Sequence, residues 1–145
     1  MDDLGKSMKP IIRPFYPHMM PEDTAIWTEY LRNPIVPIKE VWYDVHVGQG
    51  VLLPVGASDI DRRIAAGITR KRIDVVCRIA GGYWVVEIKL YASYLALGQV
   101  LVYTRLFTEE YRTQGQVFPI IMANNADPDL IKEFDLLGVG VIVTS

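Results

Sequence analysis

Cysteine and histidine are both scarce in this chain of 145 residues, and each shortage excludes a class of site. Cys77 is the single cysteine, so neither an intrachain disulfide nor a zinc site built from several cysteines is expected. The two histidines, His18 and His46, are far apart in the sequence and form no recognisable metal motif. We expect Cys77 to lie in the core and the histidines to have surface or packing roles.

Long hydrophobic runs are missing as well. No apolar stretch approaches the roughly 18–20 residues that span a bilayer, and the first residues lack the basic and then apolar pattern of a secretory signal. Half of the residues are nevertheless hydrophobic, which is enough for a compact core in one domain of this length. We expect a cytoplasmic protein, or a virion-associated one if a phage encodes it, with no membrane partner.

The chain has little excess charge, but its charges are unevenly distributed. The formal net charge is −2, which argues against a general nucleic-acid binder. Between residues 62 and 108, however, eight basic residues accompany only two acidic ones, Asp74 and Glu87. The basic residues can form a solvated face or hold a phosphodiester backbone. The candidates for phosphate contacts are Arg62, Arg63, Arg70, Lys71 and Arg72.

Proline and hydrophobic periodicity divide the chain into elements. Six of the nine prolines precede residue 38, so residues 1–20 are predicted to form an extended arm and residues 21–145 a single domain. The order of elements predicts an α/β domain whose mixed sheet is covered by helices. Strands are predicted over 39–47, 72–80, 83–90, 117–123 and 139–143, and helices over 21–33, 58–66 and 93–111 and from Asp127 onward.

Three features of the predicted elements depend on particular residues at their ends. Gly67 is expected to end the helix that Ser58 caps, and Ser93 is expected to cap the long helix that follows the hairpin. Gly81-Gly82 is expected to form the two-residue turn between strands 72–80 and 83–90.

Strand alternation predicts where the two isolated acids point. On the strand 72–80, Ile73 is expected to share one face with Val75, Cys77 and Ile79, leaving Asp74 on the other. Glu87 and Lys89 are two residues apart on the partner strand and therefore project from one face. Two carboxylates on adjacent strands can converge on Mg²⁺, which needs only one or two protein carboxylates. A surface ion pair between Glu87 and Lys89 is the alternative.

The chain here resembles the PD-(D/E)XK, or restriction-endonuclease-like, nuclease superfamily. The likeness rests on Asp74, a spacer of twelve residues and the sequence Glu87-Ile88-Lys89. The segment 96–103 also resembles the helix with a glutamine and a tyrosine that follows the E-x-K strand in many branches. The resemblance covers about residues 70–145 and implies a restriction-endonuclease-like core, with a central mixed sheet flanked by helices.

Site residues follow from the resemblance position by position. It implies that Asp74 and Glu87 are metal ligands, that Lys89 is the catalytic lysine, and that Gln99 is a further catalytic residue supported by Tyr103. Many members add a glutamate from the first helix, for which Glu29 is the first candidate and Glu22 the second. The chain departs from the family pattern at Ile73, where many members have proline, and in its long segment 48–70.

The leading hypothesis is a nuclease, expected to be an endonuclease, that uses Mg²⁺ or Mn²⁺ to hydrolyse DNA phosphodiester bonds. A nuclease-like structural or interaction module of a larger DNA-handling or phage assembly is the alternative, with little or no activity. A DNA-binding subunit that cuts only with a partner is a third possibility. The expected partners are DNA and either further copies of the chain or a larger assembly bound through the arm 1–20.

Overall fold

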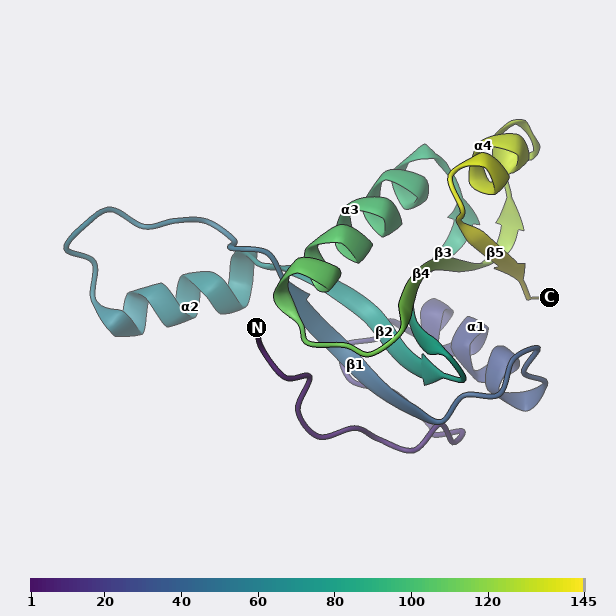
Figure 1. The fold of residues 1–145 in the computed structure, drawn as a ribbon, viewed down its shortest axis with the longest axis horizontal. Helices are drawn as coiled ribbons and strands as arrows, with labels where there is room; N and C mark the ends of the chain where they lie inside the picture. Colours follow the sequence, from purple (N-terminus) through teal and green to yellow (C-terminus); the bar gives the residue numbers. More distant parts are fainter. Residues whose placement is uncertain (145) are drawn as a thin grey trace.

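The structure, a computed structural model, describes residues 1–144 and contains a five-stranded sheet flanked by helices (Figure 1). The first three strands pair antiparallel and the last three in parallel, so the predicted α/β fold with a mixed sheet is confirmed. The order of the strands across the sheet is the same as their order along the chain. They are β1 (Glu40–Val47), β2 (Lys71–Ile79), β3 (Gly82–Ala92), β4 (Gln116–Ala126) and β5 (Gly140–Val143). The helices are α1 (Pro21–Arg32), α2 (Asp59–Thr69), α3 (Tyr94–Glu110) and α4 (Ile131–Leu136), the last preceded by the 3₁₀ turn η1 (Pro128–Leu130).

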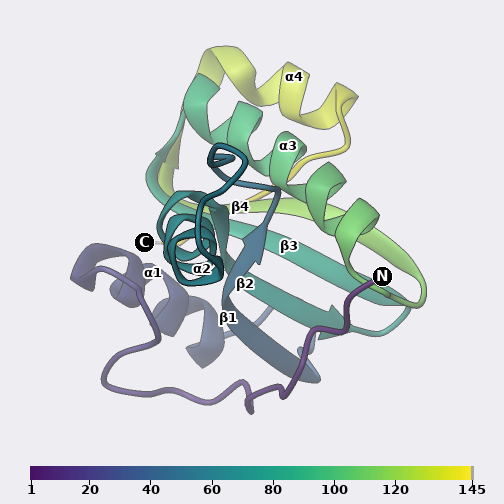
Figure 2. The ribbon, with the colours of Figure 1, turned by 90° about the vertical axis from the view of Figure 1, so that its left-hand side faces the viewer.

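Helices cover both faces of the sheet (Figure 2). Helix α1 packs on one face, where Trp27 joins Val75, Cys77 and Val86 in a buried cluster that we call the α1 core. Helix α3 packs on the other face, where Phe107 belongs to a second buried cluster, the α3 core. Cys77 is fully buried, as the sequence predicts. Within residues 1–144, none of the helices combines the length and the apolar character needed to cross a bilayer.

The alternation of β2 changes at Asp74, and here the sequence prediction is wrong. Val75 lies in the α1 core together with Cys77, but Ile73 lies in the α3 core. The neighbouring strand β1 changes in the same way, since Tyr43 packs against the α1 core and Val45 belongs to the α3 core. Between them Asp44 has a φ of 54°, a left-handed conformation that rotates the following residues to the opposite face.

Three local predictions also need correction. Gly67 does not end α2, which continues to Thr69. Ser93 occupies the N-cap of α3, but its side chain makes no capping hydrogen bond. Ile79 pairs with Gly82, so the hairpin turn consists of Ala80 and Gly81, and only Gly81 has a positive φ. Gly82 is required for a different reason, because a Cβ there would lie 2.0 Å from the Gln116 carbonyl oxygen.

Residues 1–20 contain no helix, and the only strand pairing that they make with the rest of the described chain is through isolated β-bridges. Met8 pairs with Val41 of β1, and the backbone carbonyl of Gly5 accepts a hydrogen bond from the indole of Trp42 at 3.0 Å. Tyr16 is buried in the α1 core, and its hydroxyl lies 2.9 Å from that of Thr28. The arm is therefore held along its length by the domain itself.

Candidate active site

Asp74 lies where the pairing between β2 and β3 ends. The last paired residues are Val75 and Val86. Beyond them the Asp74 carboxyl, through Oδ2, accepts a hydrogen bond of 2.8 Å from the backbone N–H of Ile88. The side chain thus takes the place of the strand carbonyl that would continue the ladder. It is fixed at the opening between the two strands, next to Glu87.

Glu87 is the buried member of the carboxyl pair. Its side chain is 2% exposed, and Oε1 has no hydrogen-bond partner among the described residues. Burial raises the pKa of Glu87 well above its ordinary value, and the charge of Asp74 raises it further, whereas Lys89 opposes this rise. Burial also raises the pKa of Asp74, against the hydrogen bond from Ile88 and the charge of Lys89. The two carboxyl groups repel each other when both are ionised, and a proton or a cation between them relieves the repulsion.

Helix α3 places two of the predicted residues on the same side of the site. Burial raises the pKa of Tyr103, and the charges of Glu87 and Asp74 raise it further, so the phenol lies within electrostatic range of both. Gln99 is one turn earlier, and its Oε1 is buried with no partner in the part of the chain that the structure describes. Among the hydrogen bonds of residues 1–144, none joins Gln99 to either carboxyl group.

The acid that α1 directs toward this site is Asp23. Its pKa is raised by burial and lowered by the nearby charge of Lys89, and its own charge raises the pKa of Asp74. Glu29, the first candidate from the sequence, instead forms an exposed ion pair of 3.1 Å with Arg32. The sequence analysis missed Asp23, although its spacing from Ile26, Trp27 and Tyr30 places it on the buried face of the helix.

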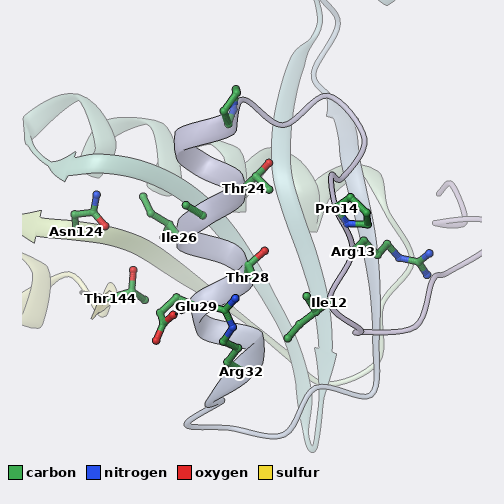
Figure 3. Close-up of a pocket in the computed structure, with 12 residues that line it drawn as sticks. Ile12, Arg13, Pro14, Thr24, Ile26, Thr28, Glu29, Arg32, Asn124 and Thr144 are labelled. Atoms are coloured by element: carbon green, nitrogen blue, oxygen red, sulfur yellow. Dashed lines mark hydrogen bonds and ion pairs between the residues drawn. The ribbon is translucent and has the colours of Figure 1, made fainter.

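A cavity of about 730 Å³ lies beside α1, and Glu29 lines it together with Thr24, Thr28 and Arg32 (Figure 3). On the other sides it is bounded by the arm at Arg13 and by residues near the ends of β4 and β5. Neither Asp74 nor Glu87 contributes to its lining. This cavity is therefore separate from the carboxyl pair.

The five predicted phosphate contacts have different surroundings. Arg70 pairs with Glu110 and donates to the Gly48 carbonyl at 2.6 Å, so its guanidinium is engaged within the fold. Arg72 donates to the Gly67 carbonyl at 2.7 Å, and Arg62 donates to the carbonyls of Pro54 and Ala57. Arg63 and Lys71 are exposed and form no ion pair with the residues that the structure describes.

The two histidines meet at one carboxylate, which their sequence separation does not predict. Asp44 Oδ2 lies 3.5 Å from His18 Nε2 and 3.6 Å from His46 Nε2. Arg72 is 3.6 Å from the same oxygen. Across residues 1–144, no group of three or more histidine, cysteine, aspartate or glutamate side chains is arranged to hold a metal ion.

The carboxyl pair nevertheless offers the donors that a hard divalent cation needs. Asp74 and Glu87 are neighbouring carboxylates, and Glu87 Oε1 is a buried oxygen without a partner among residues 1–144. Mg²⁺ is commonly bound through one or two carboxylates, with water and substrate phosphate completing its shell. The residues present therefore fit this cation or Mn²⁺.

Comparison with known proteins identifies the fold. No protein-family model matches the chain, and no curated protein has a matching sequence. A repair endonuclease from Pyrococcus abyssi is similar in structure over 92% of this chain and 50% of its own, with a TM-score of 0.55 and 17% identity. A protein of unknown function, AF1548, is similar over 70% of this chain and 47% of its own, with a TM-score of 0.44 and 15% identity. This chain spans about half the length of either protein, and it has an α/β fold similar to that of part of a repair endonuclease.

Proposed function

We propose that this chain is a nuclease that depends on a divalent metal and hydrolyses DNA phosphodiester bonds. The observation that carries the proposal is the carboxyl pair of Asp74 and Glu87, with a buried oxygen that lacks a partner among the described residues. Isolating two carboxyl groups in this way costs folding free energy, and a cation at the site would offset that cost. The fold shared with part of a repair endonuclease supports the same function.

Asp74 and Glu87 would hold Mg²⁺ or Mn²⁺. Such an ion would act as a Lewis acid toward a phosphoryl oxygen. It would also lower the pKa of a bound water molecule, so that a nucleophile is available at neutral pH. The hydrogen bond from Ile88 fixes the Asp74 carboxyl, and burial fixes that of Glu87. Both side chains are thus oriented before any ligand arrives, which reduces the entropy lost on binding.

Lys89 would act on the phosphate. Its ammonium group is close enough to Asp23, Asp74 and Glu87 to lower the pKa of all three carboxyl groups. A compact positive charge in this position stabilises the negative charge that grows on the phosphoryl oxygens in the transition state. Gln99 and Tyr103 would orient the phosphate or the attacking water from α3, through an amide and a phenolic hydroxyl.

DNA is the proposed substrate because exposed cations precede Asp74 in the sequence. Lys71 and Arg72 begin the strand that carries Asp74, and Arg63 lies on the preceding helix. Their charges are suited to the sugar–phosphate backbone and carry no base preference. We accordingly propose that the protein cuts within DNA strands, as an endonuclease, and that it does not recognise a base sequence by itself.

The test is cleavage of supercoiled, linear, branched and single-stranded DNA by the pure protein with Mg²⁺, with Mn²⁺ and with EDTA. Asp74→Asn, Glu87→Gln and Lys89→Met should each reduce cleavage at least about 100-fold. The first two remove a carboxylate that would hold the cation, and the third removes the positive charge that would stabilise the transition state. Glu109→Gln is the matched control, because Glu109 forms an exposed ion pair with Arg105 on α3. Activity that is equal in the wild type and all four variants would show that the cleavage comes from a contaminant.

A second candidate is an interaction module with a nuclease-like fold and little activity. The exposed apolar residues of the segment 48–70 favour it, because such residues are typical of binding surfaces. This alternative predicts that the wild type, like its Asp74→Asn variant, cuts no DNA with either metal.

A further inference from the structure

The antiparallel strands β1 and β2 exchange the faces of their side chains at the same level of the sheet. The pairs on the two sides of this level are Tyr43–Val75 and Val45–Ile73, in an unchanged register that sets Asp44 opposite the acid of β2. The first pair lies at the α1 core and the second in the α3 core. Because paired residues of antiparallel strands share a face, a change of face in one strand has to be matched in the other.

The unusual backbone conformation lies in β1. Asp44 has a φ of 54°, whereas no residue of β2 has a positive φ. Left-handed conformations are several times more common at aspartate than at most other residues, and they are unfavourable for alanine and glutamate. The change of face is therefore associated with the identity and the conformation of Asp44.

Three side chains from different segments surround the Asp44 carboxylate, which is 15% exposed. His18 Nε2 of the arm lies 3.5 Å from Oδ2, and His46 Nε2 and Arg72 Nη1 each lie 3.6 Å from the same oxygen. His46 and Arg72 are also paired with each other across β1 and β2, just beyond the change of face. The carboxylate thus contacts both strands at the point where they turn.

We propose that Asp44 is a positioning residue for the candidate active site, whose left-handed backbone imposes the change of face on β2 and so places the Asp74 carboxyl in the opening toward β3. This inference rests on the proposed function, since it treats Asp74 as a metal ligand. The ladder between β2 and β3 ends at Val75–Val86, one residue before Asp74. The Ile88 N–H then donates to the Asp74 carboxyl at 2.8 Å, so this amide reports the position of the side chain.

The buried side chains beyond Asp44 determine how a variant should respond. Val45, Val47 and Ile73 are at most 8% exposed in the α3 core. Returning all three to the other face would cost more than one unfavourable left-handed residue. A variant at position 44 should therefore keep the fold, and its strain should appear as more frequent local opening around Asp74.

The first experiment measures hydrogen exchange of the Ile88 amide by NMR, in the full chain without metal or DNA. Asp44→Glu keeps the charge and loses the preference for a left-handed backbone, whereas Asp44→Gly loses the charge and accepts that backbone. Exchange at Ile88 should be at least about threefold faster in Asp44→Glu and in Asp44→Ala, and should stay within about twofold of the wild type in Asp44→Gly.

The matched control is Glu40→Ala. Glu40 is also a β1 carboxylate, and it pairs with Arg78 of β2 at 2.7 Å, but its φ is not positive. This variant should leave the exchange of Ile88 within about twofold of the wild type. Circular dichroism checks that every variant is folded.

The second experiment measures DNA cleavage by the same variants with Mg²⁺. Asp44→Glu should lower kcat at least about threefold and leave KM within about twofold, because a displaced Asp74 affects the reacting groups more than the binding of DNA. Asp44→Gly should retain the kcat of the wild type.

Four results would each overturn the proposal. They are wild-type exchange of Ile88 in Asp44→Glu, equally fast exchange in Asp44→Gly and Asp44→Glu, a comparable acceleration in Glu40→Ala, and an unchanged kcat of Asp44→Glu in a protein that cuts DNA. A wild type that cuts no DNA would contradict the proposed nuclease function alone. The exchange of Ile88 would still decide whether Asp44 positions Asp74, since it is measured without metal or DNA.

Discussion

Replacing Glu87 by glutamine should stabilise the protein in the absence of divalent metal. The substitution keeps the size and planar shape of the side chain and removes a buried ionisable group beside Asp74. The new amide can donate a hydrogen bond to the Asp74 carboxylate at any pH, whereas Glu87 can donate one only while it holds a proton. A buried polar group without a partner costs about 1–3 kcal/mol, so the free energy of unfolding should rise by about that amount at pH 8.

The effect should depend on pH with a defined sign. In the folded protein the pKa of Glu87 is raised well above the ordinary value of 4.5. Between the two values the folded chain holds a proton that the unfolded chain has lost, so the wild type loses stability as the pH rises through this window. Below about pH 4.5 the wild-type side chain is neutral in both states, and the advantage of Glu87→Gln should then disappear.

Urea unfolding with EDTA, followed by tryptophan fluorescence at pH 8 and about pH 3.5, measures both effects, since Glu87 is mostly neutral in both states at the lower pH. At the length of this chain, 1–3 kcal/mol corresponds to a shift in Tm of about 3–9 °C. Mg²⁺ or Mn²⁺ at about 100 times its dissociation constant should stabilise the wild type by about 2.7 kcal/mol. The variant should gain much less, and Glu109→Gln should behave like the wild type. A Glu87→Gln protein that is equally or less stable than the wild type at pH 8 without metal would refute the reasoning.

Three further substitutions test the packing around the sheet by urea unfolding. Gly82→Ala should destabilise the fold by about 1–3 kcal/mol, since the new Cβ would lie 2.0 Å from the Gln116 carbonyl oxygen. Gly98→Ala is the control, because a Cβ at that position has no atom within 4 Å. Tyr43→Phe should cost about 1–3 kcal/mol, because the buried indole N–H of Trp27 loses its acceptor at 2.9 Å, and an unchanged midpoint would contradict this. Ser58→Ala should cost about 0.5–2 kcal/mol, as it removes the hydrogen bond of 3.0 Å from the N–H of Asp61; no loss of stability would mean that α2 does not depend on its cap.

The order of the elements could be predicted because it depends on local patterns. The proline in the first turn of α1, the cap at Ser58 and the alternation of apolar residues in β3 each act within a few residues. The mixed sheet follows from this order, since a hairpin joins β2 and β3 and a helix joins β3 and β4. The limits of the elements were less predictable: Gly67, for instance, adopts a helical conformation and α2 continues past it.

The surroundings of the carboxyl pair could be predicted only in part. The sequence indicates that Asp74 and Glu87 lie on adjacent strands, and it indicates nothing of the break in alternation at Asp74. That break lies beside a matching break at Asp44 of β1, which is distant in sequence and has a left-handed φ. The contribution of α1 also differs from the expectation. The resemblance points to a glutamate in the first helix, whereas Asp23 is the acid whose charge reaches Lys89 and Asp74.

The break in alternation and the opening of the ladder occur at the same level of the sheet, and this coincidence has a physical basis. In a regular strand Asp74 would lie on the same face as Val76, and the backbone of β2 would continue to pair with β3. The shift at Asp44 and Asp74 moves Ile73 to the α3 core, and the ladder to β3 ends at Val75. The N–H of Ile88 then needs another acceptor, and the Asp74 side chain supplies it. The hydrogen bond that orients this carboxyl group therefore exists because the strands separate. An Asp74→Asn substitution should preserve this hydrogen bond, and Asp74→Ala should remove it.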